Sequence, residues 1–337
     1  MIKKAGASTI RFTDSVSIVG YAGVAGKKEA DGPLKNDFDK IFYDMHAGQN
    51  TWEKAESTLQ KEALSIALNK AGISASDVGF LFAGDLLNQC VSSSYGLKDF
   101  QIPYLGQYGA CSTMVQGLIM ACVMVESRAS MYSACVTSSH FCSAERQYRF
   151  PLDYGGQRPQ SSQWTVTGAG SSIVTHKKCE NMPKVLSATV GKIVDLGVKD
   201  QNNMGAAMAP AAADTLKQFF IDTATSADDY DMIYTGDLGK IGSKLLYELM
   251  EKEGYSIKNN HSDCGVMIYD CDEMDVHSGG SGCGCCGSVL CGHILRKVAD
   301  KKLNNILVMA TGALLSPTSV QQKQSIPCIA HLVNIVS

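Results

Sequence analysis

The 337-residue sequence lacks an excess of charge of either sign. Its 30 lysines and arginines oppose 33 aspartates and glutamates, which gives a formal net charge of −3 at pH 7. The sequence contains neither a basic block nor an acidic tail. Because nucleic-acid-binding proteins usually concentrate positive charge on one face or in one stretch, this balance argues against a nucleic-acid partner.

Long hydrophobic runs are also missing. The longest apolar run in the most hydrophobic stretch, residues 118–125, is far shorter than the roughly 18 to 20 residues that cross a bilayer. The N-terminal region shows no apolar segment followed by a cleavage site. We therefore expect no signal peptide and no transmembrane segment. We expect a protein of a cytoplasm-like compartment, which would reach a membrane only through partner proteins.

The 13 cysteines lack the regular spacing of a disulfide framework, and their number is odd. We therefore interpret them as reduced thiols. The sequence Cys283-Gly-Cys285-Cys286 looks like part of a metal site, but no second pair follows at zinc-site spacing. Packing of small residues at a helix start explains these cysteines better, so we expect neither a metal ion nor a cofactor.

The most informative segment that is present is Gly109-Ala-Cys111-Ser-Thr. A predicted strand over 102–108 ends there, and a predicted helix over 112–126, apolar almost all round, begins. A cysteine at a helix N-terminus faces unpaired N–H groups and the positive end of the helix dipole, so its thiol pKa should fall. Cys111 is thus a candidate nucleophile at the base of a pocket. The alternative is a small buried hydrophobic residue.

The two halves of the chain carry the same signals in the same order. A buried strand ending in Gly-Asp-Leu, a small-residue turn before an apolar helix, and a strand ending in Thr occur at 77–86, 109–113 and 129–137, and again at 231–238, 280–288 and 305–312. Amphipathic helices at 52–71 and 212–224 precede the Gly-Asp strands. This order indicates a duplicated structure.

Strands that alternate with helices predict an α/β fold with parallel sheets covered on both faces. Two such units facing each other would form a layered body built from two pseudo-repeats about an approximate two-fold axis. The polar stretch at 177–184 is the best join. We therefore predict one half at 1–180, which carries Cys111, and a second at 181–337.

Several longer motifs are distinctive as written. They are Gly84-Asp85-Leu-Leu-Asn-Gln, Gly109-Ala-Cys-Ser-Thr, Thr137-Ser-Ser-His140, Tyr154-Gly-Gly-Gln-Arg-Pro, Met208-Ala-Pro-Ala-Ala-Ala-Asp-Thr, Thr311-Gly-Ala-Leu-Leu-Ser-Pro-Thr and Ile326-Pro-Cys-Ile-Ala-His331. Together they resemble the stage V sporulation protein AD family of spore-forming Firmicutes, from about residue 23 to residue 331. The duplicated body with a cysteine before a buried helix resembles the wider thiolase and ketoacyl-synthase superfamily.

The resemblance implies a thiolase-like αβαβα fold and a homodimer formed through the first half. It also implies that the chain binds dipicolinic acid (pyridine-2,6-dicarboxylate), or its calcium chelate, and takes part in its uptake into the developing spore. Membrane proteins of the same sporulation operon are the implied partners, which would place the chain at the spore inner membrane.

The resemblance to condensing enzymes also raises an enzymatic function as an alternative to ligand binding. Condensing enzymes need a thiolate and two further groups, usually imidazoles, but the corresponding positions here hold Asp237 and Ser281. A carboxylate beside an enolate would oppose its formation, which argues against condensation. The alternative function is an acyl-thioester condensing enzyme or acyltransferase that uses Cys111 as its nucleophile. A structural subunit of a membrane channel is a third.

A dicarboxylate ligand would need charge-assisted donors, and the guanidinium of Arg158 is the preferred one. His331 resembles part of a thiolase turn that returns to the active site, and His140 follows a strand end. For both, a hydrogen bond to the backbone is the alternative. Asp85 and Asp237 either take part in calcium coordination or cap the turns that follow them. The ligand-binding candidates are therefore Cys111, Asp85, His140, Arg158, Asp237, Ser281 and His331.

The stretch 144–159 holds two further arginines and two aromatic residues. For Arg146 and Arg149 we favour ion pairs at a dimer interface. Phe150 or Tyr154 would supply a wall for a pyridine ring.

Overall fold

A computed structural model of the chain describes residues 2–148 and 158–337. The principal strands are β1 (Ile2–Ala5), β2 (Thr9–Gly26), β3 (Lys40–Phe42), β4 (Val78–Gly84), β5 (Tyr104–Gly106), β6 (Tyr132–Ser139), β7 (Trp164–Thr165), β8 (Gly168–Thr175), β9 (Lys184–Val190), β10 (Met232–Thr235), β11 (His261–Asp263), β12 (Gly280–Ser281), β13 (Asn305–Ala313) and β14 (Cys328–Val336). The α-helices are α1 (Trp52–Ala71), α2 (Val91–Leu97), α3 (Thr113–Glu126), α4 (Phe141–Tyr148), α5 (Met204–Thr223), α6 (Gly239–Lys252), α7 (Cys264–Met267), α8 (Cys283–Val289), α9 (Leu295–Ala299) and α10 (Pro317–Gln321).

Within the described residues, most strands join one 12-stranded sheet whose order is β11-β10-β13-β14-β9-β2-β8-β6-β4-β5. The pairing is the same on either side of the central β9–β2 contact. In the first half β2 pairs with β8, β8 with β6, β6 with β4 and β4 with β5. In the second half β9 pairs with β14, β14 with β13, β13 with β10 and β10 with β11. This strand order agrees with the order of the sequence signals. The two-fold axis and the division at residue 180 stay predictions.

The sheet is mixed rather than purely parallel, which corrects the expectation. Strand β4 runs parallel to β5 and β6, and β10 runs parallel to β11 and β13, but β8 and β14 are antiparallel to both neighbours. The reason lies in the connections. The chain leaves β6 at Ser139 and enters β8 at the paired Gly168, and it passes likewise from Ala313 to Cys328. A connection that starts and ends at the same edge gives antiparallel strands.

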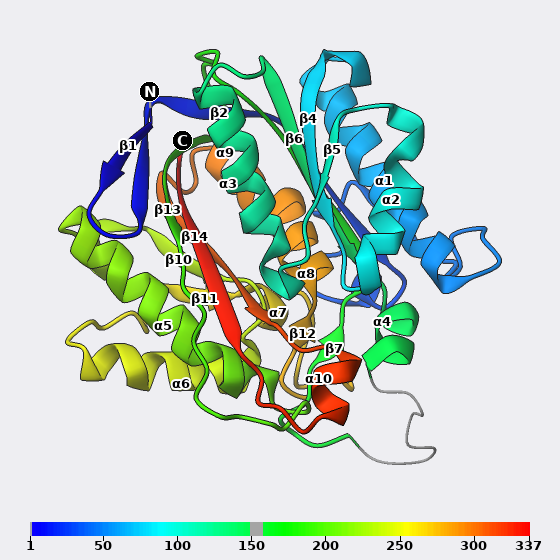
Figure 1. The fold of residues 1–337 in the computed structure, drawn as a ribbon, viewed down its shortest axis with the longest axis vertical. Helices are drawn as coiled ribbons and strands as arrows, with labels where there is room; N and C mark the ends of the chain where they lie inside the picture. Colours follow the sequence, from blue (N-terminus) through cyan, green and yellow to red (C-terminus); the bar gives the residue numbers. More distant parts are fainter. Residues whose placement is uncertain (1, 149–157) are drawn as a thin grey trace.

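Helices cover both faces of the sheet (Figure 1). Helices α1 and α2 lie outside the first half, α5 and α6 lie outside the second half, and α3 and α8 lie between the two. Helix α3 contacts β4 and β6 on one side and β13 and β14 on the other. Ten of its 14 residues are buried, as its uniformly apolar sequence predicted. The Cys111 turn therefore lies at the end of a central helix.

The helix over 52–71 is confirmed as α1. Thr51 caps its first turn by accepting a hydrogen bond from the Lys54 N–H at 3.3 Å, and Gly72 ends it in the left-handed conformation. The predicted helix over 212–224 is longer than expected, because α5 starts at Met204. Pro210 lies inside this helix, where the surrounding alanines favour helix strongly enough for it to continue through the proline.

The predicted strand over 102–108 is shorter than expected, since only β5, Tyr104–Gly106, pairs with β4. All three of its residues are exposed, and it forms the last strand of the sheet. An edge strand has pairing partners on one side only, so fewer residues are held in extended form.

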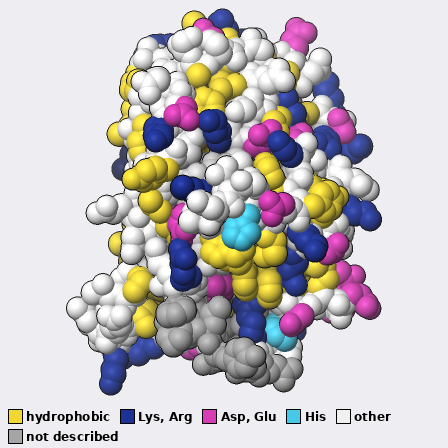
Figure 2. All heavy atoms as spheres, turned by 90° about the vertical axis from the view of Figure 1, so that its right-hand side faces the viewer, with side chains coloured by type: hydrophobic (Ala, Val, Ile, Leu, Met, Phe, Trp, Pro, Cys, Tyr) yellow, Lys and Arg dark blue, Asp and Glu magenta, His cyan; other side chains and the backbone are white. Residues whose placement is uncertain are grey.

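The surface on the side of α1 and α2 carries both signs of charge. Figure 2 shows lysine and arginine side chains interspersed with acidic ones, with hydrophobic side chains gathered between them. Among the residues that the structure describes, no helix combines the length and the apolar character needed to cross a membrane. All 13 cysteines lie in the described part of the chain and are free thiols, as predicted.

Candidate functional site

The site is built around Cys111, in a short 3₁₀ turn (Ala110–Ser112) that leads into α3. Ala110 adopts a left-handed conformation with φ of 51°. Cys111 is 6% exposed and lines a cavity of about 50 Å³. The cavity walls are mainly apolar, and they include Leu86, Ala144, Tyr148, Met204 and Leu315. This volume is well below the roughly 300 Å³ at which small-molecule sites usually begin.

Asp237 lies directly behind this cavity, just after β10, and is fully buried. Its carboxylate accepts hydrogen bonds from Ser281 Oγ at 3.1 Å, Gly282 N at 3.0 Å and Thr311 Oγ1 at 2.8 Å. It also interacts with the Cys111 thiol. The structure therefore brings together three predicted residues, Cys111, Asp237 and Ser281. Thr311 joins them, although the sequence marked it only as a strand end.

The expected fall in the pKa of the Cys111 thiol is wrong. Burial raises that pKa well above its ordinary value, and the charge of Asp237 raises it further. The Gly282 N–H has the opposite effect on the pKa but does not outweigh burial. Desolvation and a carboxylate contributed by the second half outweigh any effect of the helix terminus. At neutral pH the thiol keeps its proton and donates to Asp237.

Asp85, which follows β4, serves as a turn cap. Its carboxylate accepts from Leu87 N at 2.9 Å, Ser93 N at 2.8 Å and Ser93 Oγ at 2.6 Å. Burial raises its pKa. In the described part of the chain, His, Cys, Asp and Glu side chains nowhere gather in threes in a way that would hold a metal ion. Of the two interpretations of Asp85, the structure provides the geometry of the cap.

The two candidate histidines are buried outside the Cys111 cavity, and both bond to the backbone. Nε2 of His140 lies 2.9 Å from Met45 O, and its Nδ1 accepts from Cys142 N at 3.2 Å. Nδ1 of His331 accepts from Gly191 N at 3.3 Å. Burial lowers the pKa of His140, and it lowers that of His331 to about 4. Both rings are therefore neutral and held by backbone contacts.

Arg158 does not line the Cys111 cavity. Its guanidinium donates to Gln163 O and lies 5.1 Å from the centre of the Trp164 ring. Arg146 pairs with Glu53 of α1 in the same chain. Arg149, Phe150 and Tyr154 lie outside the described residues.

Sequence reasoning missed most of the cavity walls, because single apolar residues from α4, α5 and the β13–α10 connection carry no motif. It also missed Tyr148, whose hydroxyl donates to Leu86 O and lies 3.2 Å from that of Tyr108. A single tyrosine outside any predicted element gave no signal. The site thus offers a protonated thiol, a carboxyl group whose two oxygens both accept hydrogen bonds from the protein, and a small apolar cavity.

Comparisons with known proteins identify the family of the chain. A family model described as Stage V sporulation protein AD matches residues 6–336. The chain is 44% identical to Stage V sporulation protein AD of Bacillus subtilis (strain 168) over 330 residues, which cover 98% of this chain and 97% of that protein.

Solved structures of condensing enzymes share the fold. Cerulenin-bound OleA of Xanthomonas campestris aligns with a TM-score of 0.61 at 14% identity, over 96% of this chain and 97% of that one. The 3-oxoacyl-[acyl-carrier-protein] synthase III of Aquifex aeolicus VF5 aligns with a TM-score of 0.58 at 11% identity, over 96% and 100%. These likenesses confirm the predicted thiolase-like α/β fold.

Proposed function

Because the chain belongs to the stage V sporulation protein AD family, we propose that it binds dipicolinic acid, free or as its calcium chelate, during uptake into the developing spore. In this role it binds its ligand and does not transform it. The family assignment supports a role in sporulation, and the chemistry of the site supports binding without catalysis.

The observation that carries the proposal is the contact between Cys111 and Asp237. A nucleophilic cysteine needs a base or a positive neighbour that stabilises its thiolate. Here the buried carboxyl group of Asp237 accepts hydrogen bonds from three other donors and one from the thiol, which keeps its proton. Such a thiol is a poor acyl acceptor, so the site opposes the first step of condensation.

The rival function is acyl transfer through Cys111. One observation favours it: the thiol is retained at a cavity wall next to the first turn of the central helix. The rival predicts that acyl-CoA leaves an acyl group on Cys111. Our proposal predicts that the residue stays unmodified.

We also propose a homodimer and membrane partners. Strand β5 is the edge of the sheet, and Tyr104 and Leu105 in it are 38% and 47% exposed. Tyr95 and Tyr108 are exposed nearby in sequence. Exposed hydrophobic side chains on an edge strand are typical of a contact surface. Contact with the spore inner membrane would go through membrane proteins of the same operon.

The experiment that tests the function is isothermal calorimetry with dipicolinate, with and without calcium. Pyridine, which has the ring but no carboxylates, is the control ligand. In parallel, the protein is incubated with acyl-CoA and its mass is measured. We expect saturable dipicolinate binding and no acyl adduct. Absence of binding with and without calcium, or an adduct on Cys111, would contradict the proposal.

A further inference from the structure

A second cavity, which we call the Trp164 pocket, lies away from Cys111 and shares none of its lining residues. Its volume is about 300 Å³, compared with about 50 Å³ beside Cys111. The end of β2 and the turn after it form one wall, and Phe42, Met45, Phe141 and Trp164 form others. Small-molecule sites usually have volumes of about 300 to 1,000 Å³ and apolar walls with few polar groups. The pocket reaches the lower end of that range.

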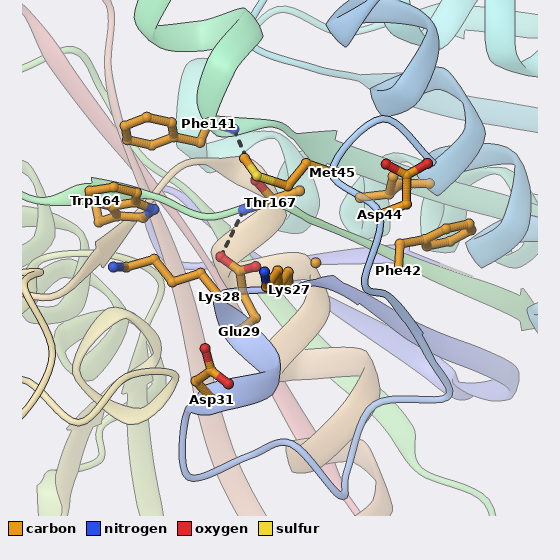
Figure 3. A pocket seen from close by; sticks show the side chains of 12 residues that line it. Lys27, Lys28, Glu29, Asp31, Phe42, Asp44, Met45, Phe141, Trp164 and Thr167 are labelled. Carbon is orange, nitrogen blue, oxygen red and sulfur yellow. Dashed lines mark hydrogen bonds between the residues drawn. The ribbon is translucent and has the colours of Figure 1, made fainter. Parts of the chain in front are cut away.

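The aromatic side of the pocket is preorganised (Figure 3). The rings of Phe141 and Trp164 stack with centroids 4.0 Å apart and an interplanar angle of 11°. Lys28 places its ammonium 4.0 Å from the centre of the Trp164 ring. In Figure 3, Met45 and Phe42 lie across the pocket from this stack. A planar ring can therefore pack against apolar side chains within reach of a fixed positive charge.

Glu29 provides a second polar group at the pocket. Its Oε1 accepts from Thr167 N at 3.1 Å and from the Tyr269 hydroxyl, whereas the buried Oε2 has no hydrogen-bond partner. Burial raises the pKa of Glu29. A buried polar atom without a hydrogen-bond partner is costly, and a ligand that bonds to it removes that cost.

A glycine keeps the space beside this oxygen open. A Cβ atom at Gly26, which also lines the pocket, would lie 2.9 Å from Glu29 Oε2 and 2.8 Å from Thr167 Cγ2. Any larger residue would crowd the unpartnered oxygen.

The other charges lie at the exposed rim. Lys27, Asp31 and Asp44 line the pocket and are exposed to solvent. Asp44 also accepts hydrogen bonds from His46 N and Gly48 N. Water and salt screen exposed charges more than buried ones, so Lys28 and Glu29 dominate recognition inside the pocket.

We propose that the Trp164 pocket binds an aromatic dicarboxylate, with its ring against Phe141 and Met45, one carboxylate on Lys28 and the other accepting from Glu29. The identity of the natural ligand, dipicolinate, rests on the function proposed above. The inference places that ligand in this pocket, whose volume is about 300 Å³, and not in the cavity of about 50 Å³ beside Cys111.

The test is calorimetry with four proteins: wild type, Lys28→Met, Cys111→Ala and Lys98→Met. Lys98 is a matched control because its ammonium also lies over an aromatic ring, 5.5 Å from Tyr95, but outside the pocket. Loss of a charge-assisted hydrogen bond should weaken dipicolinate binding about tenfold to a hundredfold in Lys28→Met. Cys111→Ala and Lys98→Met should bind like wild type.

Isophthalate (benzene-1,3-dicarboxylate), which has the same carboxylate spacing without the ring nitrogen, is the second probe. If dipicolinate binding is lost in Cys111→Ala and kept in Lys28→Met, the pocket assignment is overturned while the proposed function stands. If only isophthalate binds, and Lys28→Met weakens it, the pocket assignment stands and the proposed function fails. Absence of binding by both ligands overturns both.

As a second measurement, ligand quenching of fluorescence is recorded in a Trp52→Phe variant, in which Trp164 is the only tryptophan left. We expect saturable quenching by dipicolinate at the concentrations at which heat is released. Calorimetric binding without quenching would overturn the pocket assignment.

Discussion

The Cys111 cavity and the Trp164 pocket each adjoin a buried carboxyl group, and the two groups differ in their partners. Both oxygens of Asp237 accept hydrogen bonds from the protein, whereas Oε2 of Glu29 has no partner. The first carboxyl group is satisfied without a ligand, and the second leaves one polar atom for a ligand. The Trp164 pocket therefore offers space, an ammonium and an unpartnered oxygen, whereas the carboxyl group beside Cys111 has all its partners within the protein.

The largest expected effect is on stability, and it comes from removing the Asp237 carboxyl group. Asp237→Ala leaves the donors of Ser281, Gly282 and Thr311 without their acceptor in a buried environment. We expect the free energy of unfolding to fall by about 2 to 4 kcal/mol, measured by urea denaturation. The control Asp272→Ala removes an exposed carboxylate paired with Lys240 and should cost about 0.5 kcal/mol or less. Equal losses in both variants would contradict the role assigned to Asp237.

A smaller effect concerns the thiol itself. Asp237→Asn removes the negative charge that helps to raise the pKa of Cys111. The thiol pKa should fall, and alkylation of Cys111 at about pH 8 should become roughly tenfold faster, which corresponds to one pKa unit. Peptide mass spectrometry follows Cys111, with the partly exposed Cys179 as the internal reference. If wild-type Cys111 is already alkylated as fast as Cys179, the pKa of the Cys111 thiol is not raised and the account of this site is wrong.

The smallest effect is on the pH dependence of stability, and it concerns Glu29. Its pKa in the folded protein is raised above 4.5 by burial. Between the unfolded and folded pKa values only the folded protein keeps the proton, so stability is lost as pH rises through that window. Glu29→Gln, which mimics the protonated acid, should change stability by less than about 1 kcal/mol at low pH and decline less as pH rises.

Urea denaturation between about pH 5 and about pH 8 measures this slope for wild type and Glu29→Gln. The control Glu251→Gln, at an exposed position of α6, should keep the wild-type slope. Identical slopes in all three proteins would show that Glu29 is not protonated in the folded state.

The sequence predicted the fold well because the signals were local. Helix α1 has a threonine cap, an amphipathic pattern and a glycine stop, and the structure follows each of them. The Gly-Asp strands and the turns before the apolar helices also occur where expected, at β4, β10, α3 and α8. The antiparallel strands β8 and β14 were missed, because strand direction depends on where the connections return and not on the strands' own residues.

The site was predicted only in part, and for the same reason. Cys111 carried a local signal, and Asp237 and Ser281 joined it through the family resemblance. The sign of the pKa shift depended on burial and on a contact between the two halves of the chain, which local patterns do not contain. The Trp164 pocket combines Lys28, Phe141 and Trp164 from distant parts of the chain. Its residues follow no motif that the sequence alone would reveal.

The most direct test of the comparison is a crystal structure of the protein with dipicolinate. We predict ligand density in the Trp164 pocket, with one carboxylate beside Lys28 and the other beside Glu29, and an unmodified Cys111 next to Asp237. Dipicolinate bound against Cys111, with the Trp164 pocket filled only by solvent, would contradict the account.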